Sequence, residues 1–189
     1  MLDGSDAATC ITTVKTDVEA DMDGDVELDG RELDFETRGV FVYVGHHSGH
    51  IRQYDIYRRR QTGFQAKSDP GITAMCYYDG YLYVGHEDGT IKRISGSRRS
   101  EVIENEKVKN EETTSNDIEY IKTVAETAIS KLLVIKNKVV AVAQGIVFTV
   151  GHDLHVEEYF VGTERVASIG SYEGTMFVGG KEGIKEFQI

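Results

Sequence analysis

A repeated segment constrains the fold of this 189-residue chain more than any other feature. Residues 41–51 read FVYVGHHSGHI, and residues 81–91 read YLYVGHEDGTI, so that six of the eleven positions are identical. A third copy occupies residues 175–184, and a fourth copy with a shortened turn occupies residues 139–146. Recurrence of a short unit is typical of proteins assembled from one supersecondary element. The chain is therefore expected to consist mainly of similar units.

Each copy has the pattern of a β-hairpin. An apolar run rich in aromatic and β-branched residues leads to a glycine, a few polar residues, a second glycine and an alternating run. The second glycine supplies the positive φ angle that a tight turn between antiparallel strands requires. The first run carries almost no charge, so we expect this strand to be buried on both faces between neighbouring sheets.

Further strand-like runs flank the hairpins and enlarge the unit to four antiparallel strands. Apolar runs precede the hairpins at residues 72–78, 129–135 and 166–169, and more polar runs follow them at residues 64–67 and 156–160. Gly45 and Gly85 lie 40 residues apart, whereas Gly85 and Gly179 lie 94 apart. The longer spacing equals two units of about 40 residues plus an insertion.

Four-stranded units of this length are typical of β-propeller blades. Residues 82–92, LYVGHEDGTIK, resemble the middle hairpin of WD-repeat and quinoprotein-like propellers, and the resemblance extends over residues 38–189 apart from one insertion. The chain has no Trp and so lacks the Trp-Asp dipeptide of WD repeats, for which Tyr54 and Asp55 are the nearest substitute. We expect an all-β propeller of about four four-stranded antiparallel blades, forming one domain over residues 1–189.

Two ways of completing the propeller remain open. The last hairpin ends near the C-terminus, so its blade lacks an outer strand, and the alternating residues 9–15 could pair there and close a small ring. Alternatively the chain forms a half-ring that is completed by a partner chain or by a second copy, because propellers of this kind usually contain more blades.

Two stretches interrupt the repeat. Residues 101–117 are charged and lack an apolar period, which predicts a flexible insertion between the second and third blades. Residues 117–128 fit two structures. Asn116 and Glu119 form a helix-capping pattern, but an outer strand of the second blade is equally compatible with these residues.

An acidic segment near the N-terminus is the strongest candidate metal site. Its oxygen-bearing residues are spaced like those of an EF-hand calcium loop, but Val26 stands where that loop needs Gly. A β-hairpin that opens the first blade fits the segment better, because Asp29 and Gly30 form a turn signal between alternating apolar residues. The candidate calcium ligands would be Asp21, Asp23, Asp25 and Glu32.

Blade turns gather on the two rims of a propeller, where loops on a rigid scaffold carry binding function. One rim is expected to present His47, Ser48, His50, Glu87, Asp88, Lys181 and Glu182. The opposite rim is expected to present Asp79, Tyr81 and Tyr172. The histidines at the turns, including His46 and His86, are interpreted as solvated residues repeated from blade to blade rather than as metal ligands.

Composition limits the function classes. The net charge of −11 disfavours a protein whose main ligand is nucleic acid, since phosphate binding needs a cationic surface. Two cysteines without a disulfide or metal spacing, and an N-terminal sequence unlike a secretory signal, favour a cytoplasmic or nuclear location and no membrane association.

The sequence contains no nucleophile or phosphate-loop motif. The WD-repeat resemblance implies a non-catalytic scaffold that mediates protein–protein interaction and complex assembly without a cofactor. Its partners would be other proteins, a chain that completes the propeller, or a homo-oligomer. The alternative is a quinoprotein-like enzyme or sensor module that binds a small ligand or Ca²⁺.

Overall fold

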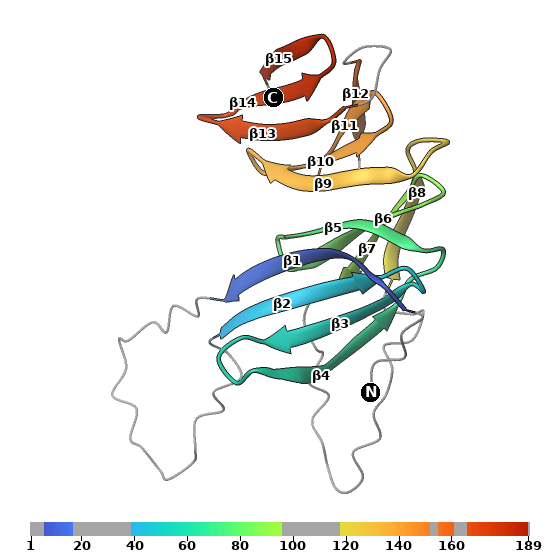
Figure 1. Cartoon of the computed structure of the whole chain (residues 1–189), viewed down its shortest axis with the longest axis vertical. Coiled ribbons are helices and arrows are strands. Elements are labelled where there is room, and N and C mark those ends of the chain that lie inside the picture. The colour runs from blue at the N-terminus through green and yellow to red at the C-terminus, as the bar shows by residue number, and fades with distance from the viewer. Residues whose placement is uncertain (1–5, 17–38, 96–117, 152–154, 161–165, 189) are drawn as a thin grey trace, which may run out of the picture.

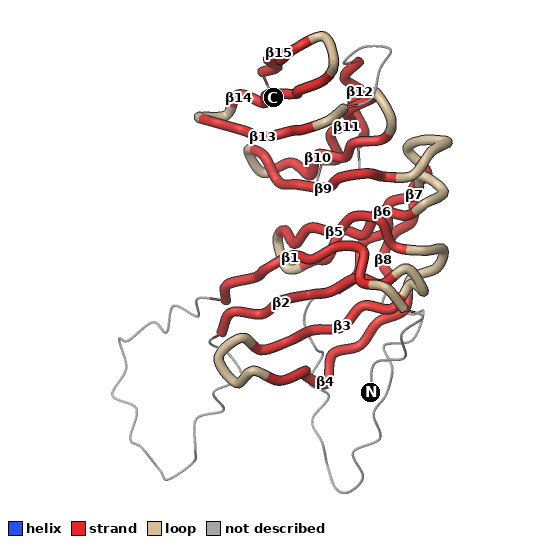
Figure 2. Tube along the Cα trace, viewed as in Figure 1, coloured by secondary structure: helices blue, strands red, loops and turns tan. Residues whose placement is uncertain are grey.

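The structure is a computed structural model that describes residues 6–16, 39–95, 118–151, 155–160 and 166–188. These residues form strands joined by short loops, and Figure 2 shows no helix among them. No helix in the described part of the chain is long and apolar enough to cross a membrane.

The strands form four consecutive antiparallel sheets, and each sheet is built from neighbours in sequence. The first three sheets have four strands each, and the last has three strands within the described residues. In sheet order the strands are β1 (Ala8–Thr16), β2 (Gly39–His46), β3 (His50–Asp55) and β4 (Arg60–Lys67); β5 (Ile72–Tyr78), β6 (Tyr81–His86), β7 (Thr90–Ser95) and β8 (Ile118–Thr123); β9 (Ile129–Ile135), β10 (Lys138–Ala143), β11 (Ile146–Val150) and β12 (Val156–Phe160); and β13 (Ser168–Tyr172), β14 (Thr175–Gly180) and β15 (Gly183–Gln188).

The sheets are arranged as propeller blades. In Figure 1 they follow one another in sequence order along the longest axis, so that the first and last sheets occupy its two ends. The first strands of successive sheets are neighbours, since β5 contacts both β1 and β9. The predicted all-β propeller of four-stranded antiparallel blades is confirmed, and the described strands form an arc.

Hydrophobic residues fill the spaces between adjacent sheets. One core cluster joins the first and second sheets, a second joins the second and third, and a third joins the third and fourth. The middle strands β6 and β10 are buried on both faces, as their almost uncharged sequences predict. Such strands need a sheet on each side, because apolar surface on either face must be removed from water.

The alternative in which residues 9–15 pair with the last sheet is wrong. These residues lie within β1, which pairs with β2 as the innermost strand of the first sheet. The physical reason is the fit of this strand to its neighbour. The pairing of Ala8 with His46, followed by an irregularity, repeats the pairing of Ile72 with His86 in the second sheet, and Val14 enters the first core cluster.

The structure also distinguishes the two interpretations of residues 117–128. Residues 118–123 form the strand β8, which pairs with β7 and completes the second sheet. A helix would leave the backbone groups along this edge of β7 without sheet partners, which is costly. The proposed insertion at 101–117 and the proposed hairpin that contains Asp29 and Gly30 lie outside the described residues.

Two repeated glycines allow the sheets to approach closely. A Cβ atom on Gly85 would lie 2.6 Å from Cγ2 of Ile129 in the next sheet, and a Cβ atom on Gly45 would lie 2.9 Å from Cγ2 of Ile72. Both isoleucines are fully buried. In the first and second sheets, the first glycine of the hairpin therefore receives an isoleucine from the first strand of the following sheet.

Substitution of Gly85 by Ala should destabilise the protein by about 1–3 kcal/mol, because the new methyl group overlaps Ile129. Shortening the opposing side chain should relieve the overlap. The double variant Gly85→Ala/Ile129→Ala should therefore lose less stability than the two single variants added together. Urea denaturation measures the free energies of unfolding, and strict additivity would contradict the close contact.

Candidate interaction surfaces

A buried histidine joins the first two sheets. His86 ends β6, and its Nδ1 donates a hydrogen bond to the carbonyl oxygen of Pro70 at 2.6 Å. Its Nε2 lies 3.1 Å from Oγ of the buried Ser68, whose hydroxyl donates to it. Burial, assisted by the charge of Lys92, lowers the pKa of His86 despite the Pro70 hydrogen bond. The side chain is thus a neutral structural group.

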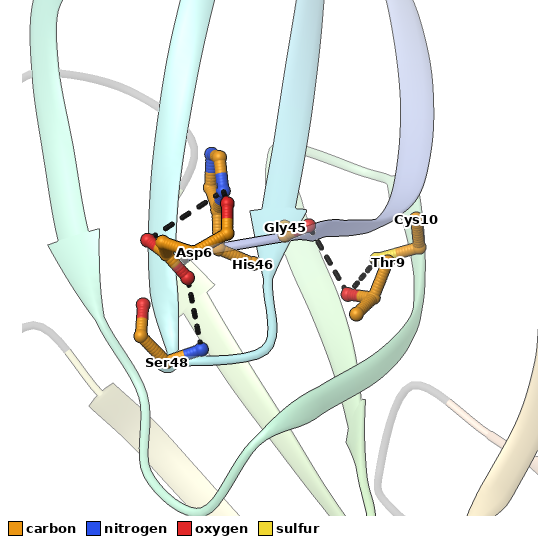
Figure 3. Close-up of polar contacts among 6 residues, drawn as sticks. All are labelled: Asp6, Thr9, Cys10, Gly45, His46 and Ser48. Atoms are coloured by element: carbon orange, nitrogen blue, oxygen red, sulfur yellow. Dashed lines mark hydrogen bonds and ion pairs between the residues drawn. The ribbon is translucent and has the colours of Figure 1, made fainter. Parts of the chain in front are cut away.

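His46 occupies the equivalent position in the first sheet but lacks the complete set of partners. It is buried, and its Nδ1 lies 3.3 Å from the carbonyl oxygen and 3.6 Å from Oδ2 of Asp6 (Figure 3). Its Nε2 is buried without a hydrogen-bond partner among the described residues. The interpretation of His46 and His86 as solvated turn residues is wrong, because both rings face the interior at the ends of buried strands.

Asp6 contributes a hydrogen bond to the β2–β3 turn, and the sequence alone does not indicate this role. Its Oδ1 accepts a hydrogen bond from the backbone nitrogen of Ser48 at 3.2 Å, as Figure 3 shows. The hydrogen bonds from Ser48 lower the pKa of Asp6, although partial burial opposes this effect. Next to it, Thr9 donates to the carbonyl oxygen of Gly45 at 3.1 Å. No local sequence signal indicates these contacts, because they join residues about forty positions apart.

Part of the first expected rim is brought together by the chain that links β4 to β5. His47 and Glu87 flank Gly71, where a Cβ atom would lie 3.2 Å from the histidine Nδ1 and 3.3 Å from the Glu87 Oε2. Both side chains and that of Ser48 are exposed, and His50 is half-buried. These residues belong to the turns β2–β3 and β6–β7, which lie on the same side of the molecule in Figure 1.

The other residues of this rim have local partners. Asp88 is exposed and accepts hydrogen bonds from the backbone nitrogen and the hydroxyl of Thr90, at 3.0 and 2.6 Å. Partial burial opposes ionisation of Asp88, but these bonds outweigh it and lower the pKa. The exposed Lys181 and Glu182 lie on the distant β14–β15 turn, where Glu182 pairs with Lys185 at 3.4 Å.

The residues expected on the opposite rim do not form one cluster. Asp79 is exposed in the β5–β6 turn, and Tyr81 is half-buried with Cζ of Arg93 4.4 Å from its ring centre. That contact favours a structural role for Tyr81. Tyr172 is exposed at the end of β13, two sheets away.

The metal candidates Asp21, Asp23, Asp25 and Glu32 lie outside the described residues. Within the described ranges, no group of three or more His, Cys, Asp or Glu side chains could hold a metal ion. Burial raises the pKa of Cys76 to about 12 and also raises that of Cys10, so both thiols are held in their unreactive protonated form.

An open cavity of about 360 Å³ lies along the innermost strands. Its walls come from all four sheets, through β1, β5, β9 and the start of β13. The lining mixes hydroxyl groups, one amine and apolar side chains, among them Thr9, Thr73, Ser130, Lys131, Leu132 and Ile169.

Two sheet faces at the ends of the arc carry exposed apolar side chains. Directly opposed residues in antiparallel strands project to the same side, and Tyr43 and Met176 point into the first and third core clusters. The residues that alternate with them therefore face away from the neighbouring sheet. We define the first end face as Ile11, Val44, Arg52 and Tyr54, and the last end face as Tyr172, Phe177, Gly179, Ile184 and Glu186, which are all exposed or half-buried. Val42 lies on the same side of β2 as Val44 but is buried.

These sheets define a β-propeller fold of the kind found in WD40 domains. No protein-family model matches the chain, and no curated protein matches its sequence. Among solved structures it is similar to the computationally designed Ika4 protein, with a TM-score of 0.64 and 17% identity over 97% of this chain and 91% of that one. It is also similar to the WD40 β-propeller domain of Doa1, with a TM-score of 0.63 and 11% identity over 98% of this chain and 56% of that one.

A chain of the Mitotic Checkpoint Complex is a further structural neighbour, with a TM-score of 0.61 and 11% identity over 78% of this chain and 45% of that one. The present chain thus spans about half the length of these two natural neighbours. Because the sequence identities are low, the structural similarity establishes the fold alone.

The neutral state of the buried His86 predicts a pH dependence of stability. Its pKa is lowered in the folded protein, so the unfolded chain binds the proton more readily. Stability should be complete above the ordinary histidine pKa of about 6.5 and should decrease below it, by at most about 1.4 kcal/mol per pH unit from this group. His86→Gln should flatten this dependence in urea denaturation at several pH values.

The exposed His47 provides the matched control for this experiment. His47→Gln should retain the slope of the unsubstituted protein, because its ring is solvated in both states. An equal slope for the protein with His86 and for His86→Gln would contradict the assignment.

Proposed function

We propose that this chain is a non-catalytic β-propeller scaffold that mediates protein–protein interaction and complex assembly. The observation that carries the proposal is the distribution of exposed apolar side chains. Within the described residues, the exposed large hydrophobic side chains belong to the first and last sheets or to the β3–β4 turn of the first sheet: Ile11, Ile56, Tyr57, Tyr172 and Ile184. Exposed apolar groups gathered on particular surfaces are typical of interaction sites.

The rim turns are the second element of the proposal. His47, Ser48 and Glu87 are exposed on turns that are held by rigid sheets, with Asp6 and the Ser68–Gly71 link fixing the backbone beneath them. Side chains presented on a fixed scaffold lose little conformational freedom on binding. Two of the similar solved structures, the WD40 β-propeller domain of Doa1 and a chain of the Mitotic Checkpoint Complex, are compatible with an assembly role.

A ligand-binding module of the quinoprotein-like type is the second candidate. The open cavity along the innermost strands favours it, since hydroxyl groups and Lys131 stand beside apolar side chains there. The lining is shared by strands from every sheet, as expected for a ligand held in a central channel.

Calcium dependence separates the two candidates. The scaffold proposal expects the same melting temperature in the presence of Ca²⁺ and of EDTA, because it assigns no metal to the folded state. Differential scanning calorimetry of the full chain measures this quantity. An increase with Ca²⁺, which mass action requires of any ligand that binds only the folded protein, would support the calcium-binding module instead.

A rim variant tests the scaffold proposal directly. The tagged full chain, expressed in its native cells, should retain another protein in a fixed ratio, and His47→Ala/Glu87→Ala should lose it while keeping its melting temperature. Lys138→Ala, on a partly exposed residue that pairs with Glu157 at 3.2 Å, is the control and should retain the protein. Absence of any other protein in a fixed ratio would contradict the scaffold role.

A further inference from the structure

We propose that the partner that completes the propeller is a second copy of this chain, with the last end face of each copy packed on the first end face of the other. This inference deepens the proposed scaffold function by naming its first partner. It rests on the way the four sheets pack within one chain, and on the exposure that this packing leaves on the two end faces.

The repeat shows what the last end face is built to contact. The residue opposite the first glycine of the hairpin is an isoleucine in three sheets: Ile51, Ile91 and Ile184. Ile51 and Ile91 are buried, at 0% and 3% exposure, whereas Ile184 is 75% exposed. The same side of the hairpin is thus covered by a following sheet in the first two cases and uncovered in the last.

Phe177 and Gly179 extend the same comparison. Phe177 occupies the position of the buried Tyr43 and Tyr83, and it is only half-buried. A Cβ atom on Gly179 would meet Ser168 of its own sheet, whereas the equivalent Gly85 receives Ile129 from the next sheet. The last end face therefore has the residues of an inter-sheet contact without the following sheet.

The first end face shows the complementary relation. Ile11 lies opposite Val44 as Met75 lies opposite Val84, yet Ile11 is 65% exposed and Met75 is 5% exposed. Likewise Tyr54 is half-buried where the equivalent Ile94 is buried. In the second sheet these positions are covered by the preceding sheet, and the first sheet has no preceding sheet among the described residues.

The two faces match each other in type and in charge. The last end face corresponds to the side of a sheet that the following sheet covers, and the first end face corresponds to the side that the preceding sheet covers. Two copies related by a twofold axis therefore form both contacts at once and leave neither face exposed. Arg52 lies on the first face at the position of Lys92, which crosses to the carbonyl oxygen of Asp69 in the neighbouring link. Glu186 on the last face offers the opposite charge.

The size of the arc agrees with this arrangement. The chain aligns over 98% of its length with 56% of the WD40 β-propeller domain of Doa1, so its sheets account for about half of a propeller of that kind. In Figure 1 the first and last sheets stand at opposite ends of the row of sheets.

The purified full chain provides the test, by light scattering and sedimentation equilibrium at micromolar concentration. The expected mass is twice the 21.0 kDa of one chain. Ile11→Asp and Ile184→Asp should each raise the dimer dissociation constant at least about tenfold, because each places a carboxylate in both contacts of the ring. Since both side chains are exposed, the monomers should keep their circular dichroism spectra.

Mixing the two variants identifies which faces meet. A mixture contains one contact with Ile11 and Ile184 both intact, so it should form dimers that neither variant forms alone. Tyr57→Asp, on an equally exposed turn residue outside both faces, should dimerise normally.

Three results would overturn the proposal. They are a monomeric full chain, a dimer that Ile184→Asp does not weaken, and a mixture that remains monomeric. In a monomer, another protein or another segment of the polypeptide would cover the end faces. The rim-variant experiment detects a different protein and does not depend on self-association, so failure of the dimer is distinguishable from failure of the scaffold function.

Discussion

The contact between the face of one sheet and the face of the next is the interaction on which the rest of the structure depends. Each of the three core clusters lies between two adjacent sheets. No single sheet could bury both faces of a strand such as β6, so a sheet acquires its stability from its neighbours. The close approach at Gly45 and Gly85 makes this contact specific as well as apolar, because it receives one isoleucine from the following sheet.

The same dependence explains where exposed apolar groups occur. A sheet inside the arc is covered on both sides, whereas the first and last sheets each keep one face of the same residue types without a neighbour in the described chain. Ile11 and Ile184 are exposed for this reason. The exposure of these hydrophobic side chains thus marks the two faces that no sheet of the described chain covers.

Much of the fold could be predicted from the sequence, whereas little of the candidate surfaces could. The hairpins and the four-stranded sheets follow from local patterns, since alternation and turn glycines act within a few residues. The position of β1 did not follow, because alternation in residues 9–15 makes a strand without specifying which sheet edge it joins. Residues 118–123 likewise carry both a helix-capping pattern and a strand pattern, and the open edge of β7 decided between them.

The candidate site residues show the same division between features set by local sequence and features set by distant segments. The sequence alone identified the turn residues His47, Ser48 and Glu87 as exposed, because polar residues beside a hairpin glycine are usually solvated. It misjudged His46 and His86, and it did not indicate Asp6, since their surroundings come from segments distant in the chain. What the sequence by itself determined is the repeated unit and its buried strands, which depend on local periodicity and turn chemistry. Only the tertiary structure decided which faces are covered, because burial of a sheet face depends on the sheet beside it.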